Sequence, residues 1–300
     1  MPLSAVLLLS ACSSASPLAT PSADTATPSA TAAGATLVVG SQQYYSNEII
    51  AELYAQALEA KGYTIDRQYQ IGQREVYLPD LEAGKIDLMP EYSGNLLQYY
   101  DAKTTAKSGE EVLAALTTVL PAGLRPLTPA SATDQDSYNV TAEFAAQHSL
   151  ASLEDLAKVP GPLKVAANSE FEKRPYGPKG LKSFYGVDVQ VVPVEDSGGP
   201  LTVKALKDGA VQAADIYSAD PSIATNKFVT LTDPKNMILP QNVVPIASAK
   251  VDAPASATID AVNAALTTAE LVGLNARSVT EQSASAVIAK DWLTQKGLLA

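Results

Sequence analysis

Strand-like and helix-like segments alternate along this chain, and the alternation occurs twice. The first series runs strand, helix, strand, helix, strand at residues 36–40, 49–58, 63–69, 76–83 and 86–89. The second series begins at Leu163 and has strands at 163–167, 189–194 and 213–217, with helices at 180–185 and 201–207. Such alternation is typical of an open, mostly parallel sheet flanked by helices. The sequence therefore predicts an α/β fold with two similar lobes joined by two crossing strands.

The remaining segments complete this prediction. Helical patterns occur at 112–120, 152–156, 257–270 and 278–292, and strand-like patterns at 138–142, 228–231 and 243–247. The stretch that contains His148 is polar and is predicted to be a linker. We expect lobe 1 to comprise residues 36–137 plus 245–300, and lobe 2 to comprise residues 138–244.

The first residues indicate an export signal. Residues 1–12 contain a short apolar run that ends in Leu9-Ser10-Ala11-Cys12, the pattern of a bacterial lipobox with an acylated cysteine. Residues 13–35 are almost entirely Ser, Ala, Thr, Pro and Gly, a composition that predicts a disordered tether. We expect a signal peptide, lipidation at Cys12, and a protein anchored extracytoplasmically on the outer face of the cell membrane.

Composition and motifs exclude several classes of function. The formal net charge is −11, and an acidic surface disfavours binding to nucleic acid. One Cys and one His exclude an internal disulfide and Cys- or His-rich metal sites, and they disfavour a Ser-His-Asp hydrolase. The chain has no G-x-S-x-G, Walker A or H-E-x-x-H motif. We therefore expect no enzyme activity, no catalytic residues, no metal and no cofactor.

Tyrosines and carboxylates follow the ends of predicted strands. The chain has 13 Tyr against 4 Phe and 1 Trp. Tyr92 and two carboxylates lie in the segment 87–94 (DLMPEYSG), and Tyr217 lies with Asp220 in the segment 215–220 (DIYSAD) of the second series. Tyr44 directly follows the first strand. Because ligands bind at the carboxyl ends of parallel strands, this recurrence predicts a cleft between the lobes that these side chains face.

Tyrosine rings and carboxylates are suited to organic cations. A quaternary ammonium group cannot donate an N–H hydrogen bond, so it is held by aromatic rings through cation–π attraction. Arg174 either grips a ligand carboxylate or is a solvated surface charge, and spacing alone leaves both open. The pair Asp134 and Asp136 is predicted to lie in a turn.

Several segments together resemble the osmoprotectant-type substrate-binding proteins of ABC importers, which bind glycine betaine, carnitine or choline. The resemblance covers residues 37–251 and rests on Gly40-Ser41, LEAGKID at 81–87, PEYSG at 90–94, Glu170-Phe171 with Arg174, and ALKDG at 205–209 leading to DIYSAD. It implies a two-lobed periplasmic-binding-protein-like (type II) fold that delivers its ligand to a permease with a cytoplasmic ATPase. It also implies that Tyr92, Tyr138 and Tyr217 form an aromatic cage and that Arg174 grips a carboxylate.

The chain departs from its relatives at three places. Gln42 replaces a frequent Lys, Gly72-Gln73-Arg74-Glu75 replaces Gly-Gly-Thr, and Gln241-Asn242 replaces a Tyr pair. These changes remove a ring and add hydrogen-bonding groups, which favours a larger or more polar ligand such as a histidine-derived betaine. The predicted ligand-binding residues are Tyr92, Tyr138, Tyr217, Arg174, Gln42, Tyr44, Arg74, Asn242 and Asp220.

The resulting hypothesis is a monomeric, lipid-anchored solute-binding protein of an ABC importer that closes on a cationic or zwitterionic solute. Alternatives are the same fold binding a different polar metabolite, a sensor or adhesion protein without a permease, and a carboxylate-dependent hydrolase. A glycosidase cleft would need tryptophans for sugar stacking, and the one Trp, Trp292, lies near the C-terminus.

Overall fold

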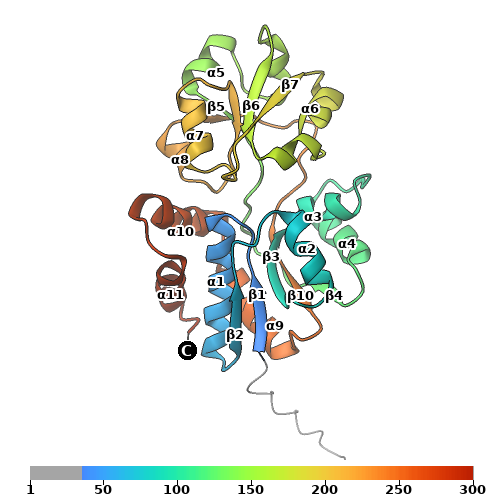
Figure 1. Cartoon of the computed structure of the whole chain (residues 1–300), viewed down its shortest axis with the longest axis vertical. Helices are drawn as coiled ribbons and strands as arrows, with labels where there is room; N and C mark the ends of the chain where they lie inside the picture. The colour runs from blue at the N-terminus through green and yellow to red at the C-terminus, as the bar shows by residue number, and fades with distance from the viewer. Residues whose placement is uncertain (1–35, 300) are drawn as a thin grey trace, which may run out of the picture. The chain divides into compact units, whose positions relative to one another are not determined.

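The structure is a computed structural model that describes residues 36–299, which contain two five-stranded sheets (Figure 1). The first sheet has the order β2-β1-β3-β10-β4, from β1 (Thr36–Gly40), β2 (Thr64–Gln68), β3 (Leu88–Tyr92), β4 (Leu124–Pro126) and β10 (Val243–Ser248). The second has the order β7-β6-β8-β5-β9, from β5 (Tyr138–Val140), β6 (Leu163–Ala167), β7 (Val189–Pro193), β8 (Ala213–Asp215) and β9 (Val229–Thr230).

The two sheets share one topology. In the first, β1 pairs in parallel with β2 and β3, while β10 runs antiparallel to β3 and β4. In the second, β6 pairs in parallel with β7 and β8, while β5 runs antiparallel to β8 and β9. Each sheet is thus mixed, with a parallel half and an antiparallel half. The predicted two-lobed α/β fold is confirmed, and we call the regions around the two sheets lobe 1 and lobe 2.

Helices cover both faces of the lobe 1 sheet (Figure 1). On one face lies α1 (Tyr45–Ala60), whose core is completed by α9 (Ala253–Ala265), α10 (Thr268–Glu281) and α11 (Ser285–Lys296), and on the other lie α2 (Arg74–Glu82), α3 (Ser93–Tyr100) and α4 (Gly109–Val119). Fully buried α1 side chains such as Ile49, Leu53 and Leu58 hold the first face together. Lobe 2 has α5 (Ala142–His148), α6 (Pro178–Tyr185), α7 (Pro200–Lys207), α8 (Ser222–Thr225) and 3₁₀ helices at Leu153–Lys158 and Ser169–Lys173. None of the helices in residues 36–299 is long and apolar enough to cross a membrane.

Two predictions of secondary structure are wrong. The two Ala-rich helices expected at 257–270 and 278–292 are three helices, because Thr267 caps α10 by accepting from the Glu270 N–H, and because the chain leaves α10 through Gln282 with a φ of 53°. The expected linker around His148 is helix α5, whose first turn is capped by the Thr141 side chain.

Two segments connect the lobes. Residues 127–137 run from β4 to β5, and residues 231–242 run from β9 to β10. They meet at an antiparallel bridge between Thr133 and Asn242 rather than in long crossing strands. Strand β10 begins at Val243 in the lobe 1 sheet, whereas the predicted lobe 1 segment begins at residue 245.

Candidate functional site

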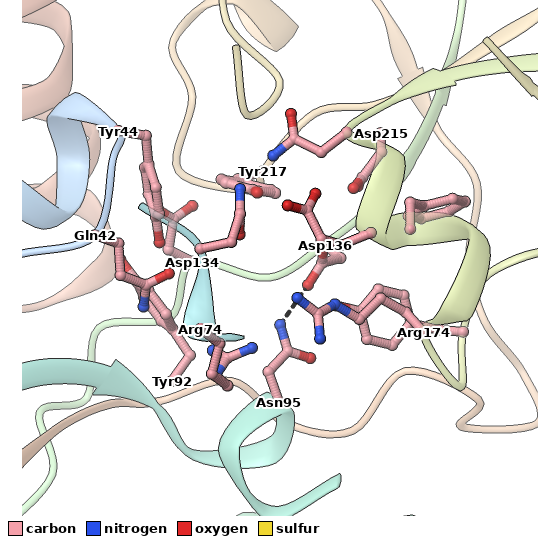
Figure 2. A pocket seen from close by; sticks show the side chains of 15 residues that line it. Gln42, Tyr44, Arg74, Tyr92, Asn95, Asp134, Asp136, Arg174, Asp215 and Tyr217 are labelled. Atoms are coloured by element: carbon pink, nitrogen blue, oxygen red, sulfur yellow. Dashed lines mark hydrogen bonds between the residues drawn. The ribbon is translucent and has the colours of Figure 1, made fainter. Parts of the chain in front are cut away.

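A small cavity of about 40 Å³ lies where strand ends of both sheets meet the first connecting segment (Figure 2). Gln42 and Tyr44 follow β1, Tyr92 ends β3, Asp215 ends β8, and Tyr217 comes directly after β8. The carboxyl ends of strands therefore supply the cavity from both lobes, as in other open α/β sheets. Six of the predicted site residues line it: Gln42, Tyr44, Arg74, Tyr92, Arg174 and Tyr217.

Three tyrosine rings converge on one side of the cavity (Figure 2). The ring centroids of Tyr44 and Tyr92 are 6.3 Å apart, and those of Tyr44 and Tyr217 are 5.1 Å apart in an edge-on arrangement. Burial raises the pKa of all three phenols, so they are neutral at physiological pH. The buried hydroxyl of Tyr92 has no hydrogen-bond partner among residues 36–299. The cluster thus offers aromatic faces to a ligand.

Glycine at position 94 lets β3 end against the second connecting segment. A Cβ atom at Gly94 would lie 2.6 Å from the carbonyl oxygen of Pro240 and 2.8 Å from the Leu239 Cβ. The side chain of Gln241 approaches the same turn, where it accepts from the Asn95 N–H at 2.8 Å. This close approach explains the glycine at position 94 in the segment that the sequence singled out.

Three buried aspartates also line the cavity: Asp134, Asp136 and Asp215. Asp134 accepts from the Ser46 hydroxyl at 2.9 Å and from the Ala219 N–H at 3.0 Å. Asp136 accepts from the Asn95 side chain at 2.6 Å, and Asp215 accepts from the Ser137 N–H at 3.1 Å. The carboxylates are therefore positioned by both lobes and by the segment between them.

Burial changes the titration of these acids. It raises the pKa of Asp134 to about 7, although the hydrogen bonds from Ala219 and Ser46 oppose the shift. Burial also raises the pKa of Asp215 well above its usual range, and the neighbouring carboxyl group of Asp136 adds to this. A pKa of about 7 means that Asp134 changes its protonation state near neutral pH.

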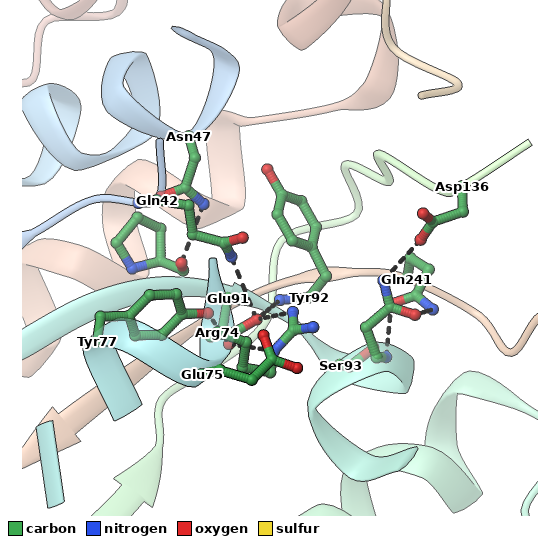
Figure 3. A network of polar contacts seen from close by, with 12 residues as sticks. Gln42, Asn47, Arg74, Glu75, Tyr77, Glu91, Tyr92, Ser93, Asp136 and Gln241 are labelled. Atoms are coloured by element: carbon green, nitrogen blue, oxygen red, sulfur yellow. Dashed lines mark hydrogen bonds and ion pairs between the residues drawn. The ribbon is translucent and has the colours of Figure 1, made fainter. Parts of the chain in front are cut away.

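Arg74 reaches the cavity while paired with a buried glutamate of its own lobe (Figure 3). Its Nε and Nη2 atoms donate to the two carboxylate oxygens of Glu91 at 2.8 and 2.7 Å. Glu91 is fully buried and also accepts from the Tyr77 hydroxyl and from the Tyr92 N–H at 2.9 Å. Gln42 donates to the same carboxylate at 3.4 Å. This network fixes both the Arg74 guanidinium and the end of β3.

Arg174 lies on lobe 2 and is paired across the cavity with Glu75 at the start of α2. The two guanidinium-to-carboxylate distances are 2.8 and 3.2 Å. Partial burial opposes ionisation of Glu75, but the hydrogen bond and charge of Arg174 prevail and lower its pKa. Glu75 is about half exposed, whereas Arg174 is largely buried. Arg174 is therefore not the solvated surface charge that spacing left open.

Three predicted residues do not line the cavity. Tyr138 lies in the lobe 2 core, where its hydroxyl donates to the Tyr176 carbonyl at 2.7 Å and its ring packs edge-on against Phe171. The Asn242 side chain donates to the Ala130 carbonyl at 3.1 Å and so binds the connecting segments together. Asp220 accepts from the Tyr45 hydroxyl at 2.7 Å in a contact between the lobes.

Sequence reasoning missed other lining residues: Gln73, Asn95, Asp134, Asp136, Asn168, Glu170, Phe171, Tyr176 and Asp215. Asp134 and Asp136 were predicted to form a turn, but their side chains point into the cavity (Figure 2). Asp215 starts the DIYSAD segment, and its place at the end of β8 was the signal that could have identified it. Cys12 lies outside the described residues.

Comparisons with known proteins identify the family of this chain. A sequence profile described as the substrate-binding domain of the ABC-type glycine betaine transport system (OpuAC) matches residues 35–295. The glycine betaine-binding protein YehZ of Escherichia coli (strain K12) is 28% identical over 275 residues, which cover 86% of this chain and 90% of YehZ. A glycine-betaine-binding protein of Pseudomonas aeruginosa is 26% identical over 279 residues, covering 88% and 89% of the two chains.

The fold matches solved structures as well. A crystal structure described as a glycine betaine/carnitine/choline ABC transporter has a TM-score of 0.71 at 20% identity, covering 89% of this chain and 100% of that chain. Since the OpuAC profile spans both lobes, the chain belongs to the family of substrate-binding domains of ABC-type glycine betaine transport systems.

Proposed function

We propose that this chain is the extracytoplasmic solute-binding protein of an ABC importer and that it captures a small quaternary-ammonium or related compatible solute between its lobes. Family membership supports the transport role. The observation that carries the ligand class is the convergence of Tyr44, Tyr92 and Tyr217 from two lobes on a cavity that buried carboxylates also line. A permease with a cytoplasmic ATPase would receive the solute, and the protein would act as a carrier without chemistry of its own.

The chemistry of the cavity fits a methylated ammonium group. Such a group carries a positive charge but no N–H donor, so aromatic faces and nearby carboxylates are its main sources of attraction. Each ring contributes about 0.5–2 kcal/mol, depending on how far the contact is desolvated. The carboxylates of Asp136 and Asp215 would add charge attraction without requiring a hydrogen bond.

Contacts between the lobes support binding by closure. Tyr45 at the start of α1 donates to Asp220, and the Gln43 side chain donates to the Ser197 hydroxyl at 3.0 Å. Residues of both lobes line the cavity, so separation of the lobes at the two connecting segments is the motion that would admit a solute. The ligand would then select and stabilise a closed state.

Replacing Tyr92 or Tyr217 by alanine tests this proposal. We expect each change to weaken binding of the best ligand by about 1–3 kcal/mol, because it removes one aromatic face from the cation. The ligand is first selected by thermal shift from glycine betaine, choline, carnitine, ergothioneine and amino acids, and its affinity is then measured by calorimetry. Tyr99, which is 41% exposed on α3 and does not line the cavity, gives the control Tyr99→Ala. Unchanged affinity in both cavity variants would refute the cage.

We also propose that Cys12 carries the lipid anchor and that residues 13–35 tether the folded part to the membrane. When the gene is expressed in a bacterium, the protein should sediment with membranes and carry acyl chains at Cys12. Cys12→Ser should release it into the soluble extracytoplasmic fraction, while Ser14→Ala should remain bound. Mass spectrometry that found unmodified Cys12 on a soluble wild-type protein would contradict the anchor.

A further inference from the structure

The positive groups at the cavity are already matched by negative groups of the chain. Arg74 makes two hydrogen bonds with the buried carboxylate of Glu91, and Arg174 makes two with Glu75. Glu91 has no exposed surface, so a ligand carboxylate cannot take its place without leaving a buried charge unpaired. Glu75 is about half exposed and could be displaced, but only at the expense of an ion pair between the lobes.

The negative groups at the cavity have no such partners. Asp136 and Asp215 line it with 7% and 6% of their surface exposed, and no ion pair to either aspartate occurs among residues 36–299. Glu170 also lines the cavity, and its buried Oε2 atom has no hydrogen-bond partner in the described part of the chain. The raised pKa of Asp215 favours its protonated form, but with the two arginines neutralised by their glutamates, the carboxylates of Asp136 and Glu170 still leave the lining with an excess of negative charge.

Free hydrogen-bond acceptors accompany this charge. Each of the two aspartates accepts one hydrogen bond from the surrounding protein, Asp136 from Asn95 and Asp215 from Ser137. A carboxylate has about four acceptor positions, so both retain capacity for a ligand donor. The two carboxyl groups also lie close enough to interact directly, as the effect of Asp136 on the pKa of Asp215 indicates. A donor on the ligand could bind this pair, whereas a ligand carboxylate would be repelled by it.

We propose that Asp136 and Asp215 are specificity-determining residues that favour a net-cationic ligand with an O–H or N–H donor, of the choline class, over a zwitterion of the glycine betaine class. The proposal rests on the proposed function, because it concerns the same cavity. Choline and glycine betaine carry the same trimethylammonium group and differ at the other end, which is a CH₂OH group in choline and a carboxylate in glycine betaine. The difference in their affinities therefore isolates the contribution of the acidic pair.

Calorimetric titration of the full chain with choline and with glycine betaine tests the proposal. The wild type should bind choline at least about tenfold more tightly, the scale of one hydrogen bond to a charged group. Asp136→Asn and Asp215→Asn should each weaken choline binding by a similar factor and leave glycine betaine binding unchanged or stronger. Asp188→Asn, on an exposed surface position, is the matched control and should change neither affinity.

Glu75→Gln provides a second test, in which a gain of glycine betaine binding is expected. The substituted side chain is about half exposed, so this test does not depend on a change at a buried position. It frees the Arg174 guanidinium to grip a ligand carboxylate, so glycine betaine binding should become several-fold tighter while choline binding changes little. Circular dichroism before titration verifies that each variant is folded.

The outcomes separate the two proposals. Tighter binding of glycine betaine than of choline by the wild type would overturn the specificity while leaving the proposed function intact. An equal loss of affinity for choline and for glycine betaine in Asp136→Asn and Asp215→Asn would also overturn the specificity and leave the proposed function intact. Failure of the wild type to bind either methylated ammonium compound would overturn both proposals.

Discussion

Replacing Glu91 by glutamine is expected to lower the free energy of unfolding by about 3–5 kcal/mol. Glu91 is fully buried and holds both Nε and Nη2 of Arg74, which is itself only 4% exposed. Glutamine has nearly the same shape but no charge, so the guanidinium would remain buried without its counterion. The Tyr77 hydroxyl and the Tyr92 N–H donate to the same carboxylate and would lose a charged acceptor.

Urea denaturation measures this effect as a lower midpoint with an unchanged slope. The control is Glu59→Gln, which weakens an exposed ion pair with Arg67 and should cost less than about 1 kcal/mol. A loss as small as that of the control would show that the pair of Arg74 and Glu91 contributes little to stability. Because Arg74 lines the cavity and β3 ends at Tyr92, we also expect weaker ligand binding in the Glu91 variant.

The sheets could be predicted from local pattern, whereas the C-terminal helices could not. Short β-branched runs followed by amphipathic helical patterns give the alternation of both lobes, because each element buries one face against the same sheet. The region after Ala253 lacks this alternation. Its Ala-rich sequence is helical almost throughout, and only the Thr267 cap and the left-handed Gln282 separate the three helices.

The candidate site was predictable where its residues directly follow strands. Tyr44, Tyr92 and Tyr217 come at or just after the ends of β1, β3 and β8, and topology brings those ends together. The role of Tyr138 was taken from resemblance, but in β5 its side chain faces the lobe 2 core. A choice between two faces of a three-residue strand depends on packing that a local pattern does not contain.

The partners of the charged residues at the site could not be predicted from local sequence patterns. Arg174 finds its partner Glu75 on the other lobe, 99 positions away in sequence, and Asp134 is held by Ser46 and Ala219, from both lobes. These contacts depend on the path of the two connecting segments, and the spacing of apolar residues in the sequence does not reveal that path. The same contacts decide whether an arginine is free to bind a carboxylate.

The ligand-free protein is expected to lose stability as the pH rises from about 4 to about 7. Burial raises the pKa of Asp134 from 3.8 to about 7, so in this range the folded chain binds a proton that the unfolded chain has released. The free energy of unfolding then falls with rising pH, by up to about 4 kcal/mol for a shift of about three pKa units. Asp215, whose pKa is also raised by burial, should act in the same direction.

Denaturation at pH 5 and at pH 8 measures the difference. Asp134→Asn keeps an oxygen that accepts from Ser46 or from the Ala219 N–H but cannot ionise, so its stability should depend less on pH. A wild-type protein that is more stable at pH 8 than at pH 5 would contradict a raised pKa at this site.

Binding of a cation should show the opposite dependence on pH. Asp134 lines the cavity beside Tyr44, and a positive ligand stabilises its ionised form, so binding near neutral pH releases a proton. The affinity for choline should therefore rise between pH 5.5 and pH 7.5, and by less in Asp134→Asn. Calorimetry in two buffers with different ionisation enthalpies counts the protons released. An affinity for choline that falls with rising pH would mean that the aspartates bind the ligand in their protonated form, as hydrogen-bond donors. A protonated carboxyl group can also donate to the carboxylate of a zwitterion, so this result would contradict the preference proposed for Asp136 and Asp215.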